Sequence, residues 1–161
     1  MKRFLASILS ILLLCGLSSC STQTDSKEYF GFDKADFTVV EESDTHGGFL
    51  GDGSYFLILD CAANKEQASE DLEGWKPLPL SENLNLILYG GERDGVNYSY
   101  DLAEQAGFPK IENGYYYFED RHDGSLDKKD DSQLFDRGSF NFSVALYDSD
   151  TDRMYYLSFD T

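Results

Sequence analysis

The sequence predicts an α+β fold: a single, mainly antiparallel sheet of five or six strands, with one or two helices on one face and a β-hairpin at the end. Three observations predict it. Several short runs are rich in apolar and aromatic residues, two segments with helical spacing lie between them, and residues 139–161 alternate apolar and polar side chains on both sides of an Asp-rich turn.

The first half of the domain contains two predicted strands and a helix. Residues 35–42 predict a strand, and 54–60 form a continuous apolar run that is typical of a strand covered on both faces. Asn64 fits an N-cap, and the residues Ala68, Leu72 and Trp75 then fall on one side of a helix over 65–73. Gly74 and the following prolines end that helix.

The second half is predicted to be mostly strand. Leu84, Leu86 and Leu88 alternate with other residues and predict a third strand, residues 99–105 predict a short second helix, and 114–120 predict an aromatic fourth strand. In the terminal hairpin, the alternation places Phe142 and Val144 toward the core and Ser143 toward a solvated face.

The N-terminus has the pattern of an export signal. A basic start, Met1-Lys2-Arg3, precedes an apolar run over residues 4–16, and polar residues follow before the run reaches the roughly 20 residues that a membrane-spanning helix needs. We therefore interpret residues 1–19 as a signal peptide, residues 20–28 as a flexible tether, and residues 29–161 as a single α+β domain.

Leu17-Ser18-Ser19-Cys20 resembles the lipobox of bacterial prolipoproteins. The resemblance covers only the first twenty residues, and no family is recognised for the domain. It implies cleavage between Ser19 and Cys20, acylation of Cys20 with lipid (diacylglycerol and fatty acids such as palmitate), and attachment to the extracytoplasmic face of a cell membrane. Cys15 fits less well, because bulky Leu13 and Leu14 precede it. The alternative is a secreted protein with an incidental cysteine.

The charge of the mature chain limits its partners. Removing residues 1–19 takes away Lys2 and Arg3 and leaves 11 basic against 30 acidic residues, a net charge of −19. This charge disfavours nucleic acid and anionic lipid headgroups, whereas cations and basic partners would be attracted. The many Tyr and Phe residues nevertheless indicate a folded core rather than disorder.

The remaining thiol and the Asp-rich turn are interpreted structurally. Cys61 follows an apolar strand and is predicted to be a buried free thiol. Asp148, Asp150 and Asp152 have the spacing of a calcium loop, but Arg153 and Phe159 replace its Gly and Glu, so a hairpin turn is predicted. No metal site and no cofactor is predicted.

Two loops contain the only histidines. His46 lies near Asp44 and Asp52 beside a Gly-rich segment that matches no nucleotide-binding motif, and His122 lies near Asp120. Each pair has the composition of a general base with an orienting carboxylate. His122 belongs to the charged stretch 119–137, which is predicted to be a surface loop.

Two functional hypotheses follow. The first is a bacterial envelope lipoprotein whose small non-enzymatic domain binds an envelope protein or a small ligand. The alternative is a small cell-surface hydrolase or metal-dependent enzyme that uses the His46/Asp52 and His122 loops. No nucleophile or phosphate-loop motif identifies catalytic residues, which favours the first hypothesis. Clustering of His46, Asp52 and His122 in one cleft would favour the enzyme.

Overall fold

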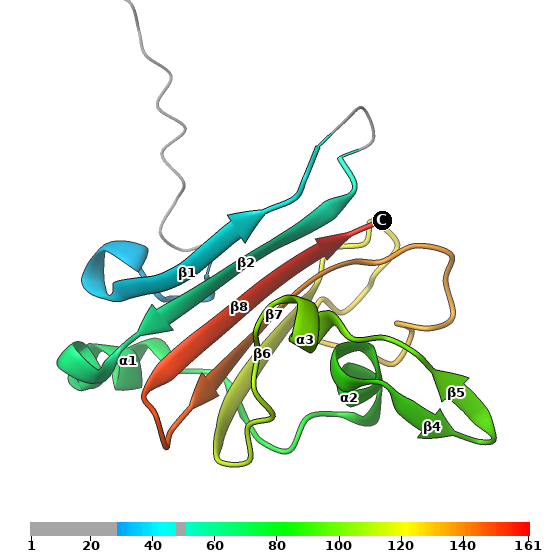
Figure 1. Cartoon of the computed structure of the whole chain (residues 1–161). Coiled ribbons are helices and arrows are strands. Elements are labelled where there is room, and N and C mark those ends of the chain that lie inside the picture. The colour runs from blue at the N-terminus through cyan, green and yellow to red at the C-terminus, as the bar shows by residue number, and fades with distance from the viewer. Residues whose placement is uncertain (1–28, 48–50) are drawn as a thin grey trace, which may run out of the picture.

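The computed structural model describes residues 29–47 and 51–161 of the chain. Its centre is a six-stranded antiparallel sheet with the strand order β1-β2-β8-β7-β6-β3 (Figure 1). Its strands are β1 (Thr38–Asp44), β2 (Gly53–Asp60), β3 (Lys76–Pro77), β6 (Gly114–Asp120), β7 (Asn141–Asp148) and β8 (Arg153–Asp160). A separate small hairpin pairs β4 (Gly91–Arg93) with β5 (Val96–Tyr98). The predicted α+β class and the terminal hairpin are confirmed.

The two faces of the sheet have separate cores, because successive strand side chains point to opposite sides. Ile58, Val144 and Leu157 belong to one buried cluster, whereas Leu57, Ala145 and Tyr156 belong to the other. The middle strands are therefore buried on both faces, as the continuous apolar run at 54–60 predicts for β2.

The first face is covered by α2 (Glu82–Tyr89) and α3 (Leu102–Gln105), which lie in front of the sheet in Figure 1. The predicted third strand at Leu84, Leu86 and Leu88 is wrong, because this segment is α2. Leu84, Ile87 and Leu88 also have helical spacing, and the Ser81 side chain accepts a hydrogen bond from the Leu84 backbone N–H at 3.1 Å. That N-cap selects the helix.

The second face is covered by the chain segment that begins at Tyr29 and by α1 (Lys65–Asp71). A short 3-10 helix, η2 (Lys34–Asp36), lies in this segment, and another, η3 (Ala62–Asn64), precedes α1. Ala68, Leu72 and Trp75 pack on this face, as their spacing predicts. Asn64 occupies the N-cap position of α1, as predicted, but its side chain donates to the Asp36 carbonyl instead of bonding a backbone N–H of the helix.

Ser143 corrects the prediction for the hairpin. Phe142 and Val144 are fully buried on the first face, and Ser143 points to the second face, as the alternation predicts. The second face is not solvated there, because Ser143 is only 1% exposed and lies under Tyr156, whose hydroxyl bonds the Ser143 hydroxyl at 3.0 Å.

The predicted signal peptide, tether and Cys20 lie outside the described residues. Within the described ranges, every helix is too short or too polar to cross a membrane.

Candidate functional site

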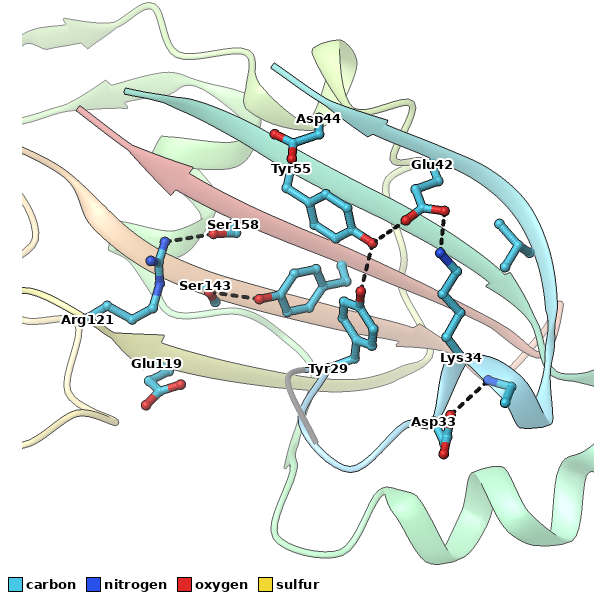
Figure 2. Close-up of a pocket in the computed structure, with 13 residues that line it drawn as sticks. Tyr29, Asp33, Lys34, Glu42, Asp44, Tyr55, Glu119, Arg121, Ser143 and Ser158 are labelled. Carbon is cyan, nitrogen blue, oxygen red and sulfur yellow. Dashed lines mark hydrogen bonds and ion pairs between the residues drawn. The ribbon is translucent and has the colours of Figure 1, made fainter. Parts of the chain in front are cut away.

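A groove with a volume of about 890 Å³ lies on the second face of the sheet (Figure 2). We call it the sheet-face groove. It is lined by the segment before β1, by the strands β1, β2, β6, β7 and β8, and by the residue that follows β6: Tyr29, Asp33, Lys34, Ala35, Val39, Glu42, Asp44, Tyr55, Glu119, Arg121, Ser143, Tyr156 and Ser158. Three other cavities among the described residues have volumes of about 480, 450 and 350 Å³.

The two-residue period of the strands places these side chains together. Tyr156 and Ser158 are two residues apart on β8, and Glu119 and Arg121 are two apart at the end of β6, so each pair points to the same face. In β1, an irregularity between Val39 and Glu41 shifts the register by one residue. Val39 and Glu42 therefore both line the groove.

Three tyrosines form one end of the groove. The rings of Tyr29 and Tyr156 meet edge to face with centroids 5.0 Å apart, and the ring of Tyr55 lies 6.0 Å from each. The hydroxyls of Tyr29 and Tyr55 share a hydrogen bond of 2.8 Å, and Tyr55 donates to Glu42 at 2.8 Å. Burial and these two hydrogen bonds raise the pKa of Tyr55, so its hydroxyl stays protonated as a donor.

Arg121 forms the other end. Its Nη2 donates to the Ser158 hydroxyl at 2.7 Å, to the Asp160 carboxylate at 2.9 Å and to the Phe142 carbonyl at 3.1 Å. These contacts fix the guanidinium against β7 and β8 (Figure 2). Its Nε is buried without a hydrogen-bond partner among the described residues.

The groove is acidic. Its lining carries four carboxylates, from Asp33, Glu42, Asp44 and Glu119, against two cations. Both cations are already paired, Lys34 with Glu42 and Arg121 with Asp160. The hydrogen bonds from Lys34 and Tyr55 lower the pKa of Glu42, and those from His46 lower the pKa of Asp44, so both remain ionised. The Glu119 side chain has no hydrogen bond or ion pair within the part of the chain that the structure describes.

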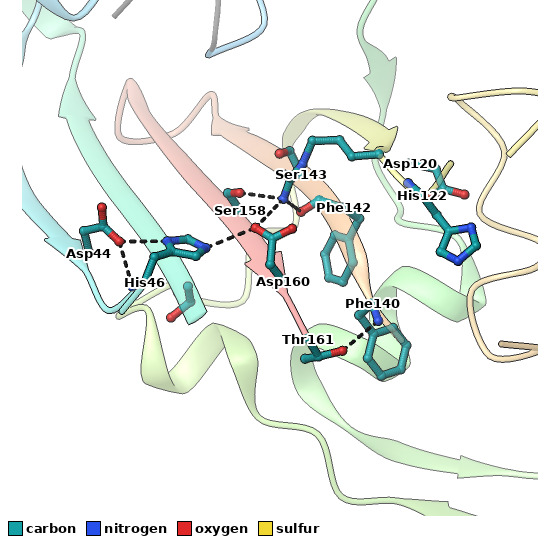
Figure 3. A network of polar contacts seen from close by, with 12 residues as sticks. Asp44, His46, Asp120, His122, Phe140, Phe142, Ser143, Ser158, Asp160 and Thr161 are labelled. Atoms are coloured by element: carbon teal, nitrogen blue, oxygen red, sulfur yellow. Dashed lines mark hydrogen bonds and ion pairs between the residues drawn. The ribbon is translucent and has the colours of Figure 1, made fainter. Parts of the chain in front are cut away.

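His46 lies beside the groove, between two carboxylates. Its Nδ1 contacts Asp44 at 2.7 Å and its Nε2 contacts Asp160 at 3.0 Å (Figure 3). A carboxylate only accepts hydrogen bonds and a neutral imidazole has one donor, so a neutral His46 could donate to only one of the two carboxylates. A general base needs a free ring nitrogen, and His46 offers none in this arrangement. Asp52 forms no hydrogen bond or ion pair with His46 in the described structure.

His122 lies on the other side of Asp160 (Figure 3). Its backbone N–H bonds Asp120 at 3.0 Å, and its Nδ1 accepts from Gly124 at 3.2 Å. His122 and Asp160 line a cavity of about 350 Å³ to which His46 does not contribute. The structure thus brings the two histidine loops to opposite sides of one carboxylate, but not into one cleft.

The charged stretch 119–137 is held by a buried ion pair. Arg137 Nη1 lies 2.8 and 2.7 Å from the two carboxylate oxygens of Asp120, whose side chain is only 4% exposed. Burial alone would raise the pKa of Asp120, but hydrogen bonds from Arg137 and the His122 backbone outweigh it and lower the pKa. The buried Leu134 also ties this stretch to the first core, so it is more ordered than a simple surface loop.

The Asp-rich segment is the turn between β7 and β8, as predicted. Its three carboxylates have separate partners: Asp148 accepts from the Asp150 backbone at 2.9 Å, Asp150 accepts from Asn113 at 2.9 Å, and Asp152 pairs with Lys65. Within the described ranges, no three Asp, Glu, His or Cys side chains are grouped as metal ligands.

Cys61 is the free thiol of the described chain. It is fully buried in the second core, as predicted, and burial raises its pKa to about 12. At neutral pH it is therefore protonated and shielded from reagents.

Comparison with known proteins identifies no relative: no protein-family model, curated protein or solved structure matches this chain significantly.

The sequence points to two residues in or beside the groove but does not reveal the groove itself. The sequence indicates Asp44 and His46 as candidates for catalysis, and in the structure Asp44 lines the groove while His46 contacts Asp44 from beside it. The missed residues, such as Tyr55, Arg121 and Ser143, come from five strands and their ends. The available signal was the row of polar side chains at alternate positions, Ser143 on β7 and Ser158 on β8 among them, on strands that are otherwise apolar.

Proposed function

We propose that this protein is a bacterial envelope lipoprotein, anchored through lipid on Cys20 to the extracytoplasmic face of a membrane, whose domain binds a partner protein or small ligand without catalysing a reaction. The sheet-face groove carries the binding part of this proposal. It is large enough for a small ligand or for several side chains of a partner.

The chemistry of the groove favours binding over catalysis. Five residues supply hydroxyls to the groove: Tyr29, Tyr55, Ser143, Tyr156 and Ser158. The hydroxyls of Tyr29, Tyr55 and Ser158 bond to other hydroxyls, to Glu42 or to Arg121, and not to an imidazole that would activate them as nucleophiles. The one neighbouring imidazole, His46, has both nitrogens directed at carboxylates. These features support recognition of a ligand by hydrogen bonds, aromatic contact and charge.

The anchor part of the proposal is supported by the lipobox resemblance at residues 17–20 and by the acidic charge of the remaining chain. A net charge of −19 disfavours electrostatic adsorption to anionic lipid, so attachment through a covalent lipid is the route that fits this composition.

Site-specific photo-crosslinking in the native envelope tests the binding function. A photoreactive phenylalanine analogue replaces Glu119, which lies in the groove, and in a matched variant replaces Glu92, which is exposed on β4 far from it. We expect the variant with the analogue at position 119 to form a light-dependent adduct of discrete, higher mass, and the variant with the analogue at position 92 to form none. No adduct at 119, or the same adducts at both positions, would overturn the proposal.

A further inference from the structure

The two edges of the sheet differ sharply. One edge is β3, which has two residues, one of them Pro77, so it offers almost no backbone for pairing. The other edge is β1, which has seven residues and pairs only with β2 in the described structure (Figure 1). Its outward N–H and C=O groups are therefore free to pair with another strand.

Part of β1 is regular enough to accept a strand. The register with β2 is irregular between Val39 and Glu41 but continuous from Glu41 to Asp44, which pair with residues from Ile58 to Tyr55. A bulge discourages an added strand from pairing with the residues beside it. The part of the β1 edge that can accept a strand therefore begins at Glu41. Most of β1 is exposed, and Val40 keeps 47% of its surface accessible.

The charge of this edge determines what it can pair with. Three of the four residues from Glu41 to Asp44 are acidic, and Glu42 and Asp44 point into the groove while Glu41 points to the other face. A second copy of the chain would bring like charges together, since the mature chain carries a net −19. A segment rich in Lys or Arg has the complementary charge.

The groove adjoins this edge and suits a cationic side chain. Neighbouring strands lie about 4.8 Å apart, so a Lys or Arg on an added strand can extend over β1 toward Glu42, Asp44 and the Tyr55 ring. Carboxylates and an aromatic ring are the groups that bind ammonium and guanidinium ions. Lys34 already occupies such a position, paired with Glu42.

We propose that β1 takes an extended, Lys- or Arg-containing segment of a partner protein as a seventh strand along Glu41–Asp44, with one cationic side chain of that segment in the sheet-face groove. This inference deepens the proposed function and rests on it. Backbone hydrogen bonds to the edge would supply affinity, and the acidic groove would select the basic sequence.

Peptide binding to the full-length protein, purified in detergent, tests this inference by fluorescence anisotropy. The probes are a labelled ten-residue peptide that alternates Lys with Val and a peptide with Glu in place of Lys. We expect saturable binding of the Lys peptide and at least tenfold weaker binding of the Glu peptide. Equal binding of the two, or binding of neither, would overturn the proposal.

Backbone methylation separates strand addition from simple charge attraction. Only alternate residues of an added antiparallel strand hydrogen-bond to the edge. Two Lys peptides are therefore N-methylated, one at the backbone amides of its Val residues and the other at the backbone amides of its Lys residues, so that the side-chain charge is unchanged. We expect one methylated peptide to bind at least tenfold more weakly and the other to bind within about threefold of the parent. Retention or loss of binding by both would overturn strand addition.

Protein variants locate the contact. Glu42→Gln and Asp44→Asn should each weaken binding of the Lys peptide about three- to tenfold. Glu92→Gln removes the same charge far from β1 and should leave binding of this peptide unchanged. Equal effects of all three would mean that binding follows net charge and would overturn the proposed contact. If the peptides did not bind as expected but position 119 still gave a specific crosslinked adduct, strand addition would be overturned and the groove would remain a binding site. The two experiments therefore test the two proposals separately.

Discussion

Asp120 and Arg137 illustrate how a single residue contact orders a charged segment. Most of the stretch 119–137 is polar, yet it is anchored because a nearly buried carboxylate pairs with one guanidinium. A buried pair adds little stability compared with an apolar pair, but removing one partner leaves the other charge buried and unpaired. The sequence contains both residues, but their separation of seventeen positions hides the pairing.

Asp120→Asn should therefore lower the free energy of unfolding by about 3–5 kcal/mol at pH 7. The folded-state pKa of Asp120 is lowered, so its ionised form stabilises the protein fully above the unfolded-state pKa of about 3.9. This stabilisation is lost as the pH falls through the folded-state pKa. Urea unfolding at pH 7 and at pH 3 measures this difference. Asp123→Asn, exposed in the same stretch, is the control and should unfold like the wild type at both values. If the difference in free energy of unfolding between the wild type and Asp120→Asn were the same at pH 7 and at pH 3, it would contradict this account.

The secondary-structure elements show where sequence patterns decide the fold and where they do not. Residues 114–120 and the terminal hairpin were predicted correctly, because aromatic and alternating runs of that length fit only strands. Residues 82–89 fit two periods at once: Leu84, Leu86 and Leu88 suit a strand, and Leu84, Ile87 and Leu88 suit a helix. The Ser81 cap decides between them, and a cap is not visible in the alternation of apolar residues.

Ser81→Ala should destabilise the protein by about 1 kcal/mol, because both the Leu84 N–H and the Asp131 carboxylate lose the Ser81 hydroxyl as a partner. Ser69→Ala serves as the control, since Ser69 is exposed within α1, and it should change stability by less than about 0.5 kcal/mol. Urea unfolding measures both variants, and hydrogen exchange at Leu84 should accelerate only in the first. Equal effects of the two substitutions would argue against the cap.

The burial of β7 on both faces leads to a second prediction for an element. Phe142→Ala should cost about 3–5 kcal/mol through lost burial and the cavity it leaves. Ser143→Ala should cost about 0.5–1.5 kcal/mol, because it removes the hydrogen bond with the Tyr156 hydroxyl. Urea unfolding compares the two variants. A Ser143→Ala variant as stable as the wild type would mean that solvent replaces this bond and that the second face is open there.

At the scale of the whole molecule, the groove could not be predicted from the sequence. Its walls come from residues between Tyr29 and Ser158, so it exists only once the strands are ordered β1-β2-β8-β7-β6. Strand order depends on long-range pairing that local periodicity does not encode. The alternation predicts that Ser143 on β7 lies on a solvated face, whereas the segment at Tyr29 covers that face and turns it into a groove.

The anchor is also a property of the whole molecule and has a direct test. We expect the wild-type protein to incorporate a fatty-acid probe in its bacterial host and to partition into detergent, and Cys20→Ala to do neither, because the lipobox resemblance assigns the acylated thiol to Cys20. Cys15→Ala is the matched control and should be labelled like the wild type. Labelling that persists in Cys20→Ala, or that is lost in Cys15→Ala, would remove the proposed anchor.

The position of Tyr29 in the groove sets how far from the lipid the groove can operate. Tyr29 lies nine residues after Cys20, and an extended chain covers at most about 3.5 Å per residue, so one wall of the groove lies within about 30 Å of an acylated Cys20. A partner would therefore be met next to the bilayer surface rather than deep in the surrounding aqueous compartment. Binding sites confined to so thin a layer favour partners that are themselves attached to the same membrane, because both then diffuse in two dimensions and meet at a high local concentration.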